Sequence, residues 1–266
     1  MHREAWDSAA GRPVGCGGAQ VPAGSRIYAI GDIHGRRDLL DEILRLIGRD
    51  AGEPRWAGET VPQRWVVVFL GDYVDRGPDS RGVVERILAG PPGRGPLAAA
   101  DWVALRGNHE DYMLRFLSDV SVGAAWCYNG GLDTVRSYAG ALPDGAEGDM
   151  AALQLRLARA VPPAHLRFLA RLPLWHAEGD YLFVHAGLRP GIAISLQDPL
   201  DLLWIRDEFL HSGASFGKVV VHGHSVTSVP EIRANRIGID TGAYHSGLLT
   251  ALVLEGDDRR FLVAGR

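Results

Sequence analysis

The chain has 266 residues, of which 46% are hydrophobic and 23% charged, and its net charge is −4. This length allows one large buried core, while the weak acidic balance gives no reason to expect a nucleic-acid partner or a basic membrane-binding surface. No apolar run approaches the ~18 residues of a transmembrane helix, and the N-terminus lacks the pattern of a signal peptide. Only Cys16 and Cys127 are present, so no disulfide framework is expected. These features favour a cytoplasmic protein with no membrane partner.

The first 24 residues are rich in glycine and show little apolar periodicity. We therefore expect a flexible tail, or a loose cover, over residues 1–24 and a single domain over residues 25–266. The domain begins with three units, each an apolar strand followed by a polar motif and an amphipathic helix, which predicts parallel strands with right-handed crossovers. The expected strands are residues 27–30, 65–70 and 102–105, and the expected helices are residues 38–47, 80–88 and 109–117.

The pattern changes between residues 120 and 175, where aromatic residues precede a stretch rich in Gly, Asp and Ala and then a helix at 150–160. We interpret this region as a helical insert beside the site, able to shape a substrate groove. After it the strand pattern returns, and the last three strands are expected to form an antiparallel run. The fold class that follows is a mixed α/β sheet protein. The later strands are expected at residues 181–184, 218–221, 236–240, 248–254 and 260–264.

Five short polar motifs follow directly after expected strands. Because the carboxyl ends of neighbouring strands meet at one edge of a sheet, these motifs should converge on a single site. Each fragment alone is a weak signal, since a lone Gly-Asp-x-His is more often a turn with a structural histidine. Five fragments in order make that interpretation untenable. The motifs are Gly-Asp-Ile-His-Gly (31–35), Gly-Asp-Tyr-Val-Asp-Arg-Gly (71–77), Arg-Gly-Asn-His-Glu (106–110), Val-His-Ala-Gly (184–187) and His-Gly-His (222–224).

The residue types in these motifs are those that bind divalent metal ions. Asp32 and His34 stand on a tight turn and can direct an oxygen and a nitrogen at one ion. Asp72 is the natural bridging carboxylate between two ions ~3.5–4 Å apart. Nitrogen and oxygen ligands without a thiolate favour manganese, iron or zinc over calcium. The side chains that would complete the second ion are Asn108, His185 and His224.

The ordered motifs resemble the phosphoprotein phosphatase (PPP) family of serine/threonine phosphatases within the calcineurin-like metallophosphoesterases. The resemblance covers roughly residues 27–254 and depends on Gly-Asp-x-x-Asp-Arg-Gly and Arg-Gly-Asn-His-Glu. The segments around His185 and His224 look more like the compact bacterial and phage members. The resemblance implies a β-sandwich of two mixed sheets flanked by helices, with a two-metal site at the carboxyl ends of the strands.

Carried over to this chain, the resemblance assigns the first ion to Asp32, His34 and Asp72. It assigns the second ion to Asp72, Asn108, His185 and one histidine of the last motif. His224 is favoured because Gly223-His224-Ser225 matches the Gly-His-Thr of small bacterial members; the alternative, His222, is interpreted as a packed histidine at a strand end. The cofactor implied is two divalent ions, manganese first, with iron or zinc as alternatives.

The resemblance also implies a mechanism in which a metal-bridging hydroxide attacks phosphorus directly. His109 is then the general acid that protonates the leaving oxygen, and Asp75 orients its imidazole. The alternative for Asp75 is a turn cap. Arg76 is the stronger candidate for binding the phosphate, together with Asn108, and Arg206 is a second candidate whose alternative is a structural salt bridge.

Two residues outside these assignments carry further expectations. Arg106 matches the third motif, and we expect it to form a buried ion pair. Tyr244, in Asp-Thr-Gly-Ala-Tyr (240–244), is expected to line the pocket, and its neighbour His245 is more simply explained as a surface or core-packing histidine.

The function expected from the sequence is a metal-dependent phosphomonoesterase, foremost a serine/threonine protein phosphatase acting on a phosphoprotein substrate. The nearest alternatives are a dinucleoside tetraphosphate hydrolase and a broad-specificity phosphatase. The tetraphosphate hydrolases resemble Gly-Asp-Leu-Val-Ala-Arg-Gly in the second motif and Asn-His-Asp in the third, whereas this chain has Asp75 and Glu110. A catalytically silent phosphoprotein-binding module is a rival of another class, and it is disfavoured because no expected ligand is missing. The pattern gives no oligomeric state.

Overall fold

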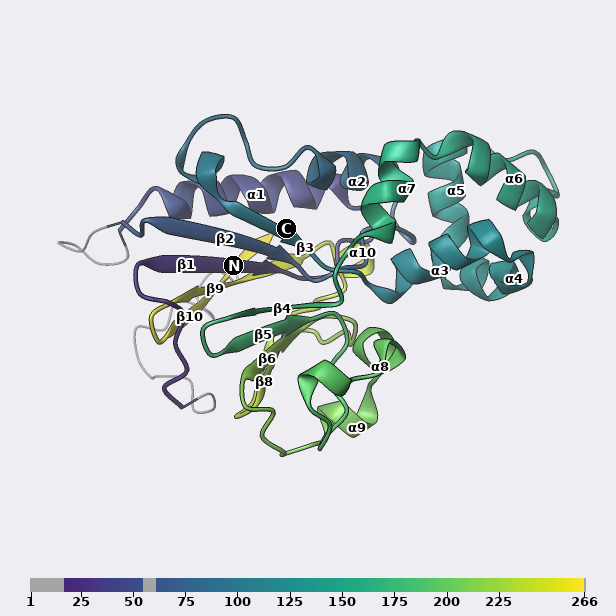
Figure 1. Ribbon diagram of the computed structural model, residues 1–266. Coiled ribbons are helices and arrows are strands. Elements are labelled where there is room, and N and C mark those ends of the chain that lie inside the picture. Colours follow the sequence, from purple (N-terminus) through teal and green to yellow (C-terminus); the bar gives the residue numbers. More distant parts are fainter. Residues whose placement is uncertain (1–16, 55–60, 266) are drawn as a thin grey trace.

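The computed structural model describes residues 17–54 and 61–265. Over these ranges two five-stranded sheets pack face to face, with helices on their outer faces (Figure 1). The predicted mixed α/β class and the two mixed sheets are thereby confirmed. None of the helices in the described ranges combines the length and the apolar character needed to cross a bilayer. The strands are β1 (Ser25–Ile30), β2 (Arg64–Phe69), β3 (Asp101–Ala104), β4 (Trp175–Glu178), β5 (Tyr181–Val184), β6 (Val219–His222), β7 (Glu231–Ile232), β8 (Arg236–Gly238), β9 (Leu249–Glu255) and β10 (Asp258–Ala264).

Helices connect and cover these strands. α1 and α2 follow β1 and β2, as the amphipathic spacing predicts, and α3 follows β3. α2 is capped at its N-terminus by Asp79, whose side chain accepts a hydrogen bond of 2.8 Å from the amide of Gly82. The helices are α1 (Arg37–Ala51), α2 (Ser80–Leu88), α3 (Asn108–Ser118), α4 (Gly123–Trp126), α5 (Leu132–Ala139), α6 (Met150–Ala160), α7 (Pro163–Ala170), α8 (Pro199–Trp204), α9 (Asp207–Leu210) and α10 (Ala243–Ser246).

The first sheet has the order β10-β9-β1-β2-β3, and the second has the order β4-β5-β6-β8-β7. β1, β2 and β3 run parallel, as the three strand-motif-helix units predict. The expected antiparallel run of the last three strands is wrong in one respect. Of these three strands, only β9 and β10 pair with each other, in antiparallel fashion, whereas β8 joins the second sheet between β6, to which it is parallel, and β7. A Gly-containing connection after a short strand does not distinguish a hairpin from a passage between two sheets.

Alternate side chains of each central strand enter different hydrophobic layers, because successive residues of a strand point to opposite faces. On β1, Tyr28 and Ile30 pack under the helices, whereas Ile27 and Ala29 pack between the two sheets. The second sheet repeats this division: Phe183 faces the first sheet and its neighbours on β5 face α8 and α9. The result is a four-layer sandwich whose carboxyl-terminal strand ends open on one side.

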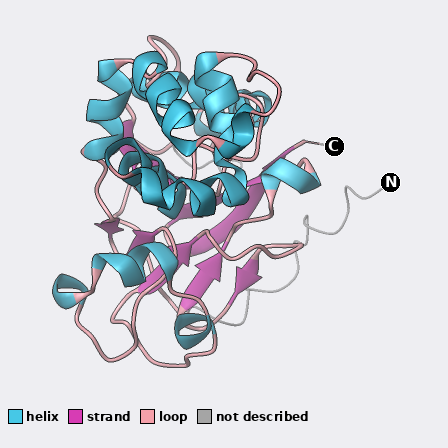
Figure 2. Ribbon diagram, turned by 90° about the vertical axis from the view of Figure 1, so that its right-hand side faces the viewer, coloured by secondary structure: helices cyan, strands magenta, loops and turns pink. Residues whose placement is uncertain are grey.

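The chain between residues 120 and 170 forms a helical lobe beyond that end of the sheets. α4, α5, α6 and α7 lie beside α3 in Figure 1, and Figure 2 shows the lobe from its own side. Between α4 and α5 the segment Cys127–Gly131 contains a kink, at which Gly130 has a non-helical backbone with φ of 103°. The lobe thus stands next to the edge on which the polar motifs converge.

Part of the segment expected to be a tail packs against the sheets. Val21 is buried, and its amide donates to the carbonyl of Gly256 at 3.1 Å. The amide of Gln20 donates to the carboxylate of Asp180, and the amide of Asp180 donates to the carbonyl of Gln20, each at 2.9 Å. Contact with the core therefore begins before residue 25. Residues 1–16, which include Cys16, lie outside the described residues.

Candidate metal centre and active site

Non-glycine residues with positive φ angles are concentrated in the predicted site. In the described part of the chain five non-glycine residues have positive φ angles, a conformation that disfavours L side chains. All five belong to the motifs that the sequence singles out. Such conformations are each worth of order 1–3 kcal/mol of strain and persist where the surrounding structure enforces them, as at active sites. The residues are His34, Asp72, Asp75, Arg76 and His224, with φ between 45° and 72°.

Glu110 holds the turn that carries three of these residues. One of its carboxylate oxygens accepts amide hydrogens from Asp72 (2.8 Å) and Gly107 (2.9 Å), and the other accepts from Tyr73 (2.7 Å) and Val74 (3.3 Å). Burial, with the neighbouring Asp72, raises the pKa of Glu110 to about 7, and the amide donors of Gly107 and Tyr73 oppose that shift. The turns after β2 and β3 are thus fixed to each other by one buried side chain.

Asp72 stands between two groups of potential ligands. Its Oδ2 is 3.4 Å from Nε2 of His34, and its Oδ1 is 3.4 Å from Nε2 of His185. Two ligands that each lie ~2.1 Å from one ion are ~3–3.5 Å apart, so both separations fit shared ions. Burial alone would raise the pKa of Asp72, but the surrounding imidazoles, led by His185 and His109, hold it below its usual range.

The second group joins Asp72 with Asn108, His185 and His224. Nδ1 of His185 donates to the carbonyl of Leu70 at 2.9 Å, so its Nε2 carries a lone pair. That lone pair faces the side-chain oxygen of Asn108 at 2.7 Å, and Nδ1 of His224 lies 2.9 Å from the same oxygen. Burial lowers the pKa of both His185 and His224 and keeps them neutral. Converging neutral nitrogens and oxygens repel one another unless a cation lies among them.

The first group contains His34, Asp72 and His109, whose ligand atoms lie within 4.8 Å of one another. Nδ1 of His34 donates to the carbonyl of Val74, which leaves the lone pair on Nε2 directed at the site. Asp32 lies next to this group. Its Oδ2 accepts the amide of His224 at 3.0 Å, and its Oδ1 is buried without a hydrogen-bond partner in the described ranges. An orphaned carboxylate oxygen beside two His/Asp groups fits a cation-binding site.

Burial, followed by the charges of Asp240 and Asp72, raises the pKa of the Asp32 carboxyl well above its usual value. A bound cation would supply the positive charge that this group of carboxylates lacks. The structure therefore brings together all six of the predicted metal ligands around a shared Asp72.

His109 and Asp75 form a buried pair. Nδ1 of His109 donates to Oδ2 of Asp75 at 2.7 Å, and its Nε2 lies 3.8 Å from Oδ2 of Asp72. Burial alone would lower the pKa of His109, but the charge of Asp72 and the hydrogen bond to Asp75 raise it above its usual value. The imidazole is thus held beside the two ligand groups in surroundings that favour its charged form.

Two residues of the helical lobe fix the carboxylate of Asp75, and the sequence did not indicate either one. Nε1–H of Trp126 donates to its Oδ2 at 2.8 Å, and the hydroxyl of Thr134 donates to its Oδ1 at 2.6 Å. The Thr134 hydroxyl also accepts the amide of Asp75 at 2.8 Å. A buried Trp and Thr in a helical segment carry no sequence signal beyond core packing. Asp75 serves as a buried hydrogen-bond acceptor rather than as a turn cap.

Arg76 lies at the entrance of the site. Its guanidinium is 2.9 Å from Nε2 of His34 and 4.7 Å from the ring centre of Tyr244. The carbonyl of Gly130, at the kink between α4 and α5, accepts the Arg76 amide at 3.2 Å, and a Cβ on Gly130 would lie 2.7 Å from Cγ of Arg76. The lobe thus also sets the position of this arginine, and the ring of Tyr244 lies 5.4 Å from that of His34.

The remaining predicted residues have more varied surroundings. Arg206 is exposed, and its guanidinium contacts the hydroxyl of Ser225 at 3.3 Å, beside His224. His222 points away from the metal groups, with its ring against Phe209. The ion pair expected for Arg106 is wrong: its side chain donates to the carbonyl of Ala170 at 2.7 Å, at the end of α7. Helix-terminal carbonyls satisfy this arginine in place of a carboxylate.

A family model for calcineurin-like phosphoesterases matches residues 25–247. The chain belongs to the calcineurin-like phosphoesterase family. Its members are divalent-metal enzymes, and the two His/Asp groups around Asp72 are the part of this chain suited to hold such ions. The match covers β1 to β8, the helical lobe and all five motifs, and it ends before β9 and β10.

Relatives of this phosphoesterase are named for two different activities. A symmetrical bis(5'-nucleosyl)-tetraphosphatase of Dechloromonas aromatica is 33% identical over 163 residues, which cover 61% of this chain and 44% of that protein. The asymmetrical bis(5'-nucleosyl)-tetraphosphatase PrpE of Bacillus cereus is 27% identical and covers 84% of this chain and 88% of its own length. Serine/threonine-protein phosphatase 1 of Salmonella typhimurium is 28% identical, with coverages of 84% and 89%.

Solved structures share the fold of this phosphoesterase. A protein provisionally described as a diadenosine tetraphosphatase superposes with a TM-score of 0.59 at 22% identity, covering 92% of this chain and 98% of its own. A protein serine/threonine phosphatase from Saccharomyces cerevisiae superposes with a TM-score of 0.53 at 15% identity, covering 91% and 80%. At these identities the likeness concerns the fold alone.

Removing one donor to Asp75 should weaken catalysis without removing a metal ligand. We expect Trp126→Phe and Thr134→Val each to lower turnover of an alkyl phosphate by about tenfold or more, because a hydrogen bond to a charged group is worth about 1.5–3 kcal/mol. Turnover of an aryl phosphate, which leaves more easily, should fall less. Steady-state kinetics with manganese, alongside Trp175→Phe on β4 as the matched control, measures this. Equal losses on both substrates would indicate a packing defect instead.

Proposed function

We propose that this phosphoesterase is a metal-dependent phosphomonoesterase of the PPP type, acting as a serine/threonine protein phosphatase. The observation that carries the proposal is the buried hydrogen bond between His109 and Asp75, fixed further by Trp126 and Thr134. A serine or threonine alkoxide is a poor leaving group and needs a proton as the ester bond breaks. A phosphoanhydride releases a better leaving group and depends less on such a donor.

We propose that the first ion is held by Asp32, His34 and Asp72, and that the second is held by Asp72, Asn108, His185 and His224. The neutral imidazoles, the orphaned oxygen of Asp32 and the ligand separations around Asp72 support this assignment. When bound, such a pair of divalent ions supplies a water that is nucleophilic at neutral pH. The donor set favours manganese, with iron or zinc as alternatives.

The side chains of this chain then perform three tasks. Arg76 and Arg206 bind the phosphate oxygens through their guanidinium groups, with Asn108 beside them. His109 donates its Nε2 proton to the leaving oxygen. Asp75 keeps the imidazole oriented and favours its charged form, as the raised pKa of His109 indicates, with Asp72 contributing to that shift.

A second candidate is hydrolysis of dinucleoside tetraphosphates. Two of the relatives described above are named for that activity, and one of them aligns with most of this chain. The relative named as a serine/threonine phosphatase aligns over the same share. A broad-specificity phosphatase would accept both kinds of substrate. The Asp75–His109 pair is the feature that favours the phosphomonoesters.

Replacing His109 distinguishes these candidates. We expect His109→Asn to lower turnover of a phosphoserine peptide by ~10²–10⁴-fold, since general acid catalysis contributes that much for poor leaving groups. The loss on an aryl phosphate should be smaller. The measurement is manganese-supplemented kinetics of both proteins on phosphopeptide, aryl phosphate and diadenosine tetraphosphate. Strong wild-type turnover of the dinucleotide with an almost inert phosphopeptide would assign the chain to the nucleotide hydrolases.

The two histidines of the last motif provide a matched test of the metal assignment. Wild-type protein and His222→Gln should each retain two manganese ions per chain after gel filtration, because His222 points toward Phe209. His224→Gln should lose the second ion, since its ring faces Asn108. Elemental analysis of the metal content decides between them. Retention of both ions by His224→Gln and loss from His222→Gln would reverse the assignment.

A further inference from the structure

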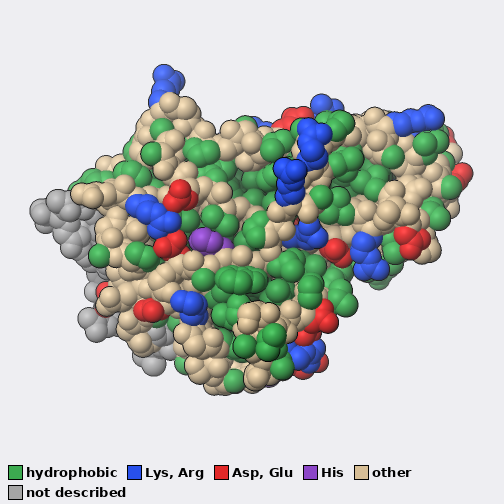
Figure 3. Space-filling view, in the orientation of Figure 1, with side chains coloured by type: hydrophobic (Ala, Val, Ile, Leu, Met, Phe, Trp, Pro, Cys, Tyr) green, Lys and Arg blue, Asp and Glu red, His purple; other side chains and the backbone are tan. Residues whose placement is uncertain are grey.

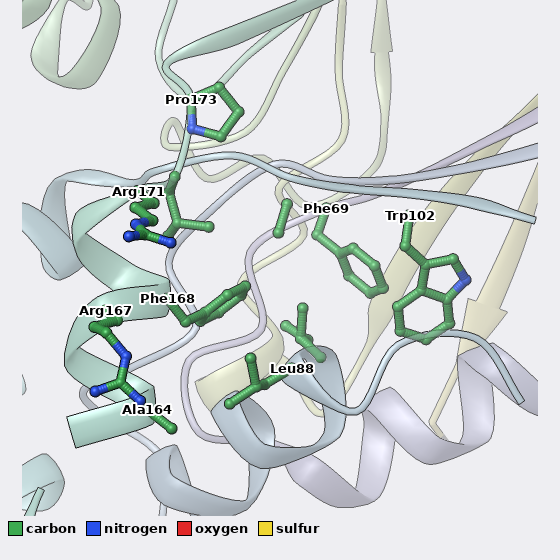
Figure 4. A pocket seen from close by; sticks show the side chains of 11 residues that line it. Phe69, Leu88, Trp102, Ala164, Arg167, Phe168, Arg171 and Pro173 are labelled. Carbon is green, nitrogen blue, oxygen red and sulfur yellow. The ribbon is translucent and has the colours of Figure 1, made fainter. Parts of the chain in front are cut away.

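A groove of about 480 Å³ lies between α2, α7 and the outer strand β3, and none of the proposed catalytic or metal-binding residues lines it. Its surface is largely apolar. In Figure 4 Phe168 extends from α7 toward Phe69 and Leu88, with Trp102 of β3 beyond them. Leu88 is 40% exposed, so an apolar side chain of this groove is accessible to a partner. The groove is therefore a candidate binding surface separate from the metal centre.

The charged residues that line the groove are all positively charged. Arg167 lies on α7 and Arg171 directly follows that helix; both are exposed, and no acidic residue lines the groove. Figure 3 shows basic side chains on this face beside hydrophobic surface. Among the residues that the structure describes, neither guanidinium has a carboxylate within 4.0 Å, whereas nearby Arg81 pairs with Glu85 at 2.9 Å. These two arginines are available to an acidic partner.

The basic character continues on the other side of Trp102. A smaller cavity of about 210 Å³ is lined there by Arg45, Arg86 and Arg94, with Asp41 as its acidic member. The guanidinium of Arg86 lies 4.9 Å from the ring centre of Trp102. Arg86 also lies 3.8 Å from Asp41, and Arg45 lies 3.8 Å from Glu42, so the charge of this second cluster is partly neutralised.

β3 itself is an edge strand. Over the described residues it pairs with β2 alone, and Trp102, Val103 and Ala104 are only half-buried, whereas every residue of β1 is buried. Trp102 and Ala104, two residues apart, both line the groove. An extended chain that paired with the free edge of β3 would place alternate side chains over the same groove.

We propose that this groove binds an extended acidic segment of a protein partner, which adds a strand to the free edge of β3. Alternate apolar side chains of the segment occupy the floor formed by Leu88, Trp102 and Phe168, and its carboxylates pair with Arg167 and Arg171. The proposal does not depend on which phosphoester the enzyme hydrolyses.

The groove is connected to the catalytic motif through both of its walls. β3 leads directly into residues 106–110, and the amide of Arg106 donates to the carbonyl of Pro173 at 2.9 Å. The Arg106 side chain holds the end of α7 through Ala170. A segment bound along β3 is thus held next to the strand that carries Asn108 and His109. The position suits a docking site for a substrate or adaptor protein.

Selection from a displayed library of random ten-residue peptides on the full-length protein tests the proposal. Enriched peptides should be rich in Asp and Glu with apolar residues at alternate positions. Their affinity, measured by fluorescence anisotropy, should fall about tenfold or more in Arg167→Glu/Arg171→Glu and weaken as salt is added. Arg159→Glu, an exposed arginine on α6 outside the groove, is the matched control and should bind as the wild type does.

Hydrogen exchange locates the bound peptide. Binding should slow exchange of the amides of β3, which strand addition predicts and which a purely electrostatic contact elsewhere does not. If Arg167→Glu/Arg171→Glu proves unstable, Arg167→Gln/Arg171→Gln gives the same comparison with less change. The proposal is overturned if no peptide depends on the two arginines, or if protection appears away from β3. It is also overturned if the groove instead binds a second copy of this chain, seen as a concentration-dependent dimer that these variants abolish.

Discussion

The geometry of the site depends on one buried carboxylate, that of Glu110, which is not itself a proposed metal ligand. Glu110 accepts amide hydrogens from the turn after β2 and from the turn after β3, and so holds the two turns together. Parallel strands bring polar residues to a common edge, but they do not determine how the backbone leaves each strand. The positive φ of Asp72 is a strained conformation that needs such an external constraint. Because Asp72 is shared by both metal groups, its placement determines the spacing of the entire centre.

The proposed proton donor, His109, is positioned from a different part of the chain. Trp126 and Thr134 of the helical lobe fix Asp75, which in turn fixes His109, while Gly130 positions Arg76. The sandwich thus supplies the metal-binding groups and the lobe orients the residues that would handle phosphate and proton. This division offers a physical reason why relatives with a similar fold can differ in substrate: a change in the lobe alters the donor and the arginine without disturbing the ligands.

Sequence reasoning succeeded where a local pattern is tied to a physical period. The amphipathic spacing of α1 and the apolar runs of β1 and β2 predicted those elements, and motifs after strands predicted where the ligands meet. The predictions were wrong or missing where packing between segments distant in the sequence determines the structure. The sheet to which β8 belongs, the carbonyl partners of Arg106 and the contacts of Trp126 with Asp75 all depend on elements distant in the chain. The sequence placed Glu110 in the third motif but did not predict its structural role, because a carboxylate that accepts hydrogen bonds from backbone amides has no distinctive sequence spacing.

The most direct test of this account is the metal affinity of Glu110→Gln. The amide side chain keeps its size but replaces one accepting oxygen with a donor that faces backbone N–H groups, so the two turns should separate and Asp72 should lose its position. Titration calorimetry with manganese should show an affinity about 10–100-fold weaker, as for other residues that support metal ligands, with the circular dichroism spectrum unchanged. Binding of two ions with wild-type affinity, together with unaltered turnover, would contradict the account.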